Sequence, residues 1–161
     1  MLPKAFDYKR WADERTLHAI EAIDKDLRPD SYEFALQQIN HMVIVEELFT
    51  SRLTGASAPH TKTNTELIPG FDELARRLDK SNEWYADFVT GLTIPTEQIS
   101  FVFADGKRGL LSVEEVLFHI LNHGSYHRGN IAHALDNASV PHPIDGYGIY
   151  IHEREPHRRE T

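Results

Sequence analysis

LFHILNHGSYHRGNI, residues 117–131, places three histidines at intervals of four: His119, His123 and His127. Residues four apart are neighbours on the surface of an α-helix, so two adjacent histidines of this series can bind one metal ion. All three cannot, because eight residues of helix span about 12 Å, whereas metal–nitrogen bonds are about 2.0–2.1 Å. The spacing therefore predicts a site on either His119 with His123 or His123 with His127. A further ligand must come from another helix.

A helical pattern extends outward from this stretch in both directions. Ser112 and Glu115 have the spacing of a capping box, which predicts a helix over 113–136. Gly124 and Gly129 interrupt this helix, although glycine in a helix costs about 1 kcal/mol relative to alanine. Close approach by another helix or by a ligand would explain these glycines.

A second helix, predicted over 31–53, provides the best third ligand. His41 is the only histidine in this range, and it is aligned with Phe34 and Val45, which we expect to face the core. Three imidazoles with an open position are typical of catalytic rather than structural zinc sites, and imidazole also suits nickel, iron and copper. We expect one divalent transition metal, with zinc or nickel as the first candidates.

The rest of the chain is predicted to be helical except for one hairpin. Helices are expected over 3–23 and 72–89, and the Gly- and Pro-containing stretch 55–70 is expected to be a long loop. Alternating apolar residues over 98–111, with a turn at Asp105–Gly106, predict a two-stranded insert. Its buried face is expected to consist of Ile99, Phe101 and Phe103. The segment after residue 136 is expected to wrap the helices and end in a polar, mobile tail.

Composition excludes several classes of protein. The chain of 161 residues, 40% of them hydrophobic, suits one soluble domain. It has no cysteine, so a disulfide framework and a thiolate metal site are excluded. A net charge of −8 argues against nucleic-acid binding. No apolar run is long enough for a membrane helix and the first residues lack a signal peptide, so we expect a cytoplasmic protein.

The same histidine spacing is also compatible with two roles that need no metal. The histidines could occupy the polar face of a surface helix, or a core helix in which neighbouring carbonyls accept their hydrogen bonds. A di-iron carboxylate site is excluded because no Glu stands three residues before any His. The zincin protease motif HExxH is also absent.

The segment HILNHGSYHRGNI is similar to the His-x3-His-Arg-Gly motif on the last bundle helix of the DinB family, also called YfiT-like. The similarity extends to NHMVIVEELFTSRL (40–53), YKRWADERTL (8–17), the hairpin and PHPIDGY (141–147). It implies an all-α protein: a four-helix bundle forming one domain over 1–161, with the hairpin before the last long helix.

The resemblance also implies which residues form the site. His41, His123 and His127 would be the metal ligands, which leaves His119 as a partner of the ligands or a wall of the pocket. Arg128 resembles the family's arginine, and we interpret it as structural rather than as a contact for an anionic substrate. Glu46, about one turn beyond His41, could reach the site, although glutamates on helices are more often solvated. Tyr126 is interpreted as a packing residue.

Two functions are open on these grounds. A metal with an open position can lower the pKa of bound water or thiol, and some members of the resembled family are thiol-dependent transferases or isomerases. The first hypothesis is therefore a metal-dependent thiol S-transferase or hydrolase acting on a small molecule, with a low-molecular-weight thiol. The second is a non-catalytic, stress-associated metal-binding homodimer that pairs through aromatic helices bearing Trp11 and Trp84. A pocket that reaches the metal would favour the enzyme.

Overall fold

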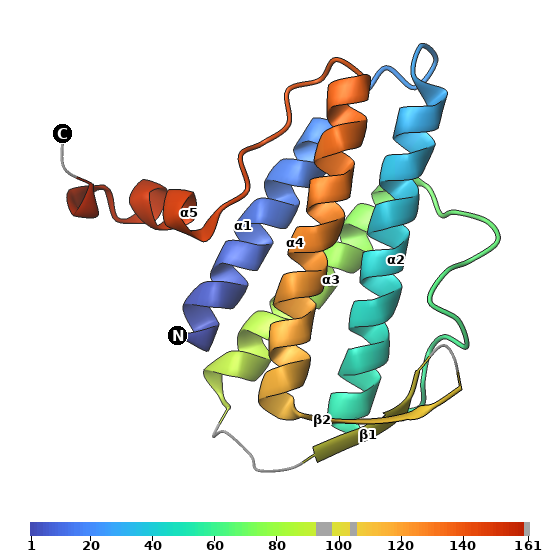
Figure 1. Cartoon of the computed structure of the whole chain (residues 1–161), viewed down its shortest axis with the longest axis vertical. Helices are drawn as coiled ribbons and strands as arrows, with labels where there is room; N and C mark the ends of the chain where they lie inside the picture. Colours follow the sequence, from blue (N-terminus) through green and yellow to red (C-terminus); the bar gives the residue numbers. More distant parts are fainter. Residues whose placement is uncertain (93–97, 104–105, 160–161) are drawn as a thin grey trace.

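Four long helices run side by side, with a hairpin at one end of the bundle and a short helix outside it (Figure 1). This computed structural model describes residues 1–92, 98–103 and 106–159. The elements in chain order are α1 (Leu2–Glu21), α2 (Pro29–Thr54), α3 (Phe71–Thr90), β1 (Gln98–Val102), β2 (Arg108–Ser112), α4 (Val113–Asn137), α5 (Tyr147–Arg154) and a 3-10 turn (Pro156–Arg158). The predicted helical bundle with a hairpin before its last long helix is confirmed.

Each long helix packs against two others. The most extensive contacts are those of α2 with α4 and of α1 with α3. In addition, α1 contacts α4 and α2 contacts α3. Apolar side chains from all four helices fill the interior in two clusters, one containing Ile20, Ile39, Leu74 and Leu135, the other containing Phe6, Phe49, Tyr85 and Ile120. Among the described residues, no helix has the length and apolarity needed to cross a membrane.

The ends of the helices follow the sequence signals closely, with one shift. The Ser112 side chain accepts a hydrogen bond from the Glu115 N–H at 3.1 Å, and the Glu115 carboxylate accepts one from the Ser112 N–H at 2.7 Å. This is the predicted capping box. α2, however, begins at Pro29 rather than near Ser31, because proline suits the first turn of a helix, where no backbone N–H donor is needed.

The hairpin packs its apolar face on α2. β1 and β2 pair antiparallel with Phe101 opposite Gly109. The buried Phe101 ring contacts the Phe49 ring edge-on, with 5.5 Å between ring centroids. Phe103 is 50% exposed, contrary to the prediction, because β1 ends at Val102 and the alternation stops there. Gly106 has a φ of 82°, as a tight turn requires; its predicted turn partner, residue 105, lies outside the described residues.

The sequence did not predict α5. After α4 the chain runs back along the outside of the bundle and reaches α5 beside α1 (Figure 1). Tyr150 packs on Trp11 with 5.5 Å between ring centroids, and Trp11 Nε1 donates to Glu153 at 3.2 Å. Trp11 is therefore covered within its own chain, so in this conformation it is not part of a surface available for dimerisation.

Candidate metal centre

Three histidine nitrogens converge where α2 faces α4. His41 lies on α2, and His123 and His127 lie one turn apart on α4. The Nε2 atom of His123 is 3.1 Å from Nε2 of His41 and 3.1 Å from Nε2 of His127, and the three ligand atoms all lie within 4.8 Å of one another. Two nitrogens on a tetrahedral zinc are about 3.3 Å apart, given bonds of about 2.0–2.1 Å. The cluster is thus compatible with one metal ion.

Hydrogen bonds on the outer ring nitrogens orient two of these histidines. The backbone carbonyl of Thr63 can only accept, so His41 Nδ1 donates to it, at 2.9 Å. The Gln38 side-chain oxygen lies 2.7 Å from His127 Nδ1 and also accepts from Asn130 Nδ2 at 3.1 Å, so His127 Nδ1 donates as well. Each of these rings therefore carries its proton on Nδ1 and directs a bare Nε2 lone pair toward the centre. This is the arrangement that metal-binding histidines require.

The donor set fits a cation better than it fits internal hydrogen bonding. Two bare lone pairs point at the same region, and His123 is the one ring of the three that could donate to either of them. Its Nδ1 is buried and has no hydrogen-bond partner among the described residues, so neither tautomer of His123 is fully satisfied. A divalent cation would be attracted to all three Nε2 lone pairs together.

Burial keeps His123 and His127 uncharged. Burial, together with the repulsion that a charge on His123 would meet from protonated forms of His127, His41 and His119, lowers the pKa of His123 to about 3. Burial and His41 lower the pKa of His127 to about 4. Both imidazoles are neutral at physiological pH, and the neutral form is the one that binds metals.

A pocket of about 290 Å³ opens directly beside the cluster. His41 and His123 form part of its wall, and His119 is next to them. The His119 ring packs between the rings of His123 and Phe49, with 5.3 Å and 5.2 Å between ring centroids. Burial lowers the pKa of His119. His119 is therefore outside the group of convergent nitrogens and forms a side of the pocket that reaches them.

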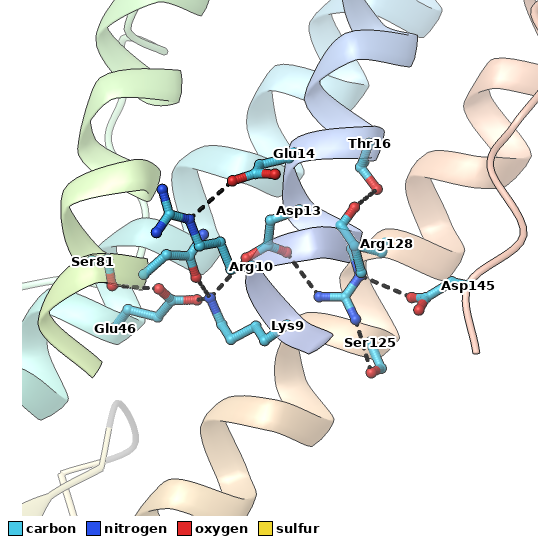
Figure 2. A network of polar contacts seen from close by, with 12 residues as sticks. Lys9, Arg10, Asp13, Glu14, Thr16, Glu46, Ser81, Ser125, Arg128 and Asp145 are labelled. Atoms are coloured by element: carbon cyan, nitrogen blue, oxygen red, sulfur yellow. Dashed lines mark hydrogen bonds and ion pairs between the residues drawn. The ribbon is translucent and has the colours of Figure 1, made fainter. Parts of the chain in front are cut away.

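A buried network of charged side chains lies near the same helices (Figure 2). Lys9 Nζ is 2.8 Å from a carboxylate oxygen of Asp13 and 2.8 Å from one of Glu46. Arg128 binds the second oxygen of Asp13 at 2.8 Å and Asp145 at 2.8 Å. The network joins α1, α2 and α4 with the segment before α5.

The contacts in this network explain three residues that the sequence analysis considered. Arg128 makes structural contacts to carboxylates of its own chain, and a Cβ added at Gly124 would lie 3.0 Å from its Nη1, so this glycine leaves room for the guanidinium. At Gly129, by contrast, no atom of the described residues outside the local helix backbone lies within 4 Å of an added Cβ, so no close approach explains this glycine. Glu46 is buried rather than solvated, and it hydrogen bonds to Ser81.

Two further expectations about side chains were wrong. Tyr126 is 66% exposed, because its side chain leaves α4 away from the core; its ring contacts the His127 ring edge-on. Phe34 is 41% exposed. The helical period locates a residue on a face of α2, but it does not indicate whether another element covers that face at that turn.

The role of Gln38 as hydrogen-bond acceptor for His127 was not predicted from the sequence. Substitution of this residue tests the metal centre directly. Gln38→Leu removes the acceptor for His127 Nδ1–H, so we expect metal affinity to fall about 10- to 100-fold while saturating metal still gives the same stoichiometry. Competition with a chromogenic chelator measures the affinity. Gln37→Leu, at the exposed neighbouring position, is the matched control and should bind metal like the parent protein. Equal affinity in the two variants would contradict the role given to Gln38.

The chain is similar in sequence to known proteins over most of its length. The profile of the DinB family matches residues 1–159. The chain is 24% identical to Protein DinB of Bacillus subtilis (strain 168) over an alignment 163 positions long, which covers 92% of each protein. No solved structure matches the chain significantly.

Proposed function

Because this chain belongs to the DinB family, we propose that it binds one divalent transition metal, zinc or nickel, and acts as a metal-dependent thiol S-transferase or hydrolase. The ligands in this proposal are His41, His123 and His127. The observation that carries it is the convergence of three Nε2 atoms next to a pocket large enough for part of a small molecule. An imidazole set with a free side is typical of catalytic sites.

The chemistry proposed for the metal is the activation of a nucleophile. A bound zinc-type ion lowers the pKa of water or thiol toward neutrality. The contribution of the chain is to hold the rings and to shape the surroundings. Thr63 and Gln38 fix the orientation of two ligands. The pocket is lined largely by apolar side chains, and surroundings of low polarity strengthen electrostatic interactions.

The alternative is a metal site that only stabilises a homodimeric bundle. A purely structural zinc is enclosed by four protein ligands, whereas the cluster here offers three histidines and borders a pocket. These two observations favour the catalytic proposal.

Elemental analysis of protein purified without chelator or affinity nickel tests metal binding. We expect about one equivalent of metal in the parent protein and almost none in the His41→Ala, His123→Ala double variant. The His18→Ala, His157→Ala double variant, with both substitutions at exposed positions, removes as many histidines and should retain the metal. A parent protein that takes up no metal even after reconstitution would exclude the proposal.

Activity is tested on the metal-loaded protein. We expect it to accelerate transfer of a low-molecular-weight thiol to an electrophile such as chlorodinitrobenzene, or hydrolysis of an activated ester, and the double variant of His41 and His123 to lose that activity. A loaded protein that accelerates neither reaction across a panel of thiols and esters would leave the structural alternative as the better account.

A further inference from the structure

Arg52 lies in the same pocket as His41, at the far end of one face of α2. The two residues are three helical turns apart, so their side chains leave the helix in nearly the same direction, about 16 Å apart along its axis. Side chains on a helix incline toward its N-terminus, which directs Arg52 back toward His41. Between them, Val45, Leu48 and Phe49 form the wall of the pocket.

Aromatic rings connect the two ends of the pocket. The guanidinium carbon of Arg52 lies 4.7 Å from the centroid of the Phe49 ring and 4.5 Å from that of Phe101. Phe49 in turn contacts His119, and His119 stacks on His123. A ligand that spans the pocket would therefore meet a mostly apolar surface, with imidazoles at one end and a cation at the other.

The charge of Arg52 is not balanced within the part of the chain that the structure describes. Its hydrogen bond goes to the carbonyl oxygen of Val102 at 3.4 Å, which is long, and no described carboxylate forms an ion pair with it. Arg10, Arg77 and Arg128 each bind a carboxylate. Burial lowers the pKa of Arg52, as expected for a partly desolvated cation.

A guanidinium has five N–H donors in a planar fork, and a carboxylate can accept two of them side by side. The guanidinium carbon lies over the Phe49 and Phe101 rings, and the one hydrogen bond to a described residue, from Nη2 to Val102, leaves other N–H donors for such bonds. We propose that Arg52 binds an anionic group, so that the substrate has an apolar body, a metal-binding end and an anionic end remote from the histidines. This inference rests on the proposed function for the end of the pocket at which the metal binds.

A matched pair of thiols tests the proposal. Zinc-loaded protein is titrated calorimetrically with 8-mercaptooctanoate and with 8-mercaptooctanol, which share the thiol and the apolar chain and differ in charge. We expect the carboxylate to bind about 10- to 100-fold more tightly, the range of a hydrogen bond to a charged group. Arg52→Gln should abolish this preference and leave the affinity for 8-mercaptooctanol unchanged.

Two variants separate anion binding from general effects. Arg76→Gln, at an exposed position of α3, makes the same change in net charge and should keep the full preference. Arg52→Lys keeps the positive charge but lacks the planar fork of donors, so its preference for the carboxylate should be intermediate. This variant still tests the proposal if Arg52→Gln fails to fold. The proposal is overturned if the parent protein shows no preference, if the preference survives in Arg52→Gln, or if Arg76→Gln loses it equally.

The metal-free protein distinguishes the failure of this inference from that of the proposed function. Octanoate and octanol have no thiol, so their affinities report on the pocket alone. If the parent protein takes up no metal but prefers octanoate in an Arg52-dependent way, the proposed function fails and the anion site stands. If metal and 8-mercaptooctanol bind but the carboxylate adds nothing, the anion site fails and the metal centre stands.

Discussion

Zinc added to the metal-free protein at about a thousand times its dissociation constant should raise the free energy of unfolding by about 4 kcal/mol. The folded chain offers three histidines from two helices, whereas the unfolded chain brings no such set together. Binding to the folded state alone therefore shifts the equilibrium toward it. Urea unfolding followed by circular dichroism, with zinc and with a chelator, measures the difference.

The His41→Ala variant provides the control for this effect. This variant keeps the pair of histidines on α4 but loses the ligand from α2. Its affinity for zinc should fall so far that the same zinc concentration is no longer in large excess over the dissociation constant. Zinc should then stabilise the variant by less than about 1 kcal/mol. Equal stabilisation of the variant and the parent would show that the ion binds elsewhere, and the assignment of His41 as a ligand would be wrong.

Asp13→Asn should destabilise the metal-free fold by about 3–5 kcal/mol, the range for breaking a buried ion pair from one side. Burial alone would raise the pKa of Asp13, but Lys9 and Arg128 outweigh it and lower that pKa, so Asp13 is charged in the fold. Asparagine has nearly the same shape and removes the charge that both cations contact at 2.8 Å. For a chain of this size the melting temperature should fall by roughly 6–20 °C. Chemical and thermal unfolding measure the two quantities.

Glu14→Gln is the matched control for Asp13→Asn. Glu14 follows Asp13 on α1 and pairs with Arg10 at 2.9 Å, and the two side chains are 56% and 43% exposed. Exposed ion pairs contribute about 0–1 kcal/mol, so this variant should unfold like the parent. If Asp13→Asn were equally mild, the buried network would not be a major source of stability.

The sequence predicted those features that repeat along the chain or have a local signature. The period of apolar residues indicated the four long helices, the pair Ser112 and Glu115 indicated where α4 begins, and the spacing of the histidines limited the ligand pair to two choices. The resemblance to the family then selected His123 with His127, the pair that the structure brings together with His41.

Other features could not be predicted because they depend on contacts between distant parts of the chain. Lys9 and Asp13, four residues apart, have the spacing of an ordinary surface pair. Their burial depends on partners from other helices, among them Glu46 and Arg128. The Thr63 contact uses a backbone carbonyl, which leaves no trace in residue type. α5 has only eight residues, too few for a periodic pattern to be distinguished from chance.

The separation of the ligands along the chain has a consequence for the order of assembly. His123 and His127 are one turn apart, so a nascent α4 already presents two ligands, whereas His41 precedes His123 by 82 residues. The third ligand arrives only when α2 docks on α4, since contacts between distant segments form after local ones. We therefore expect metal capture to complete folding rather than to start it. For the same reason, the rate at which the ion escapes from the folded protein should report how often these two helices separate.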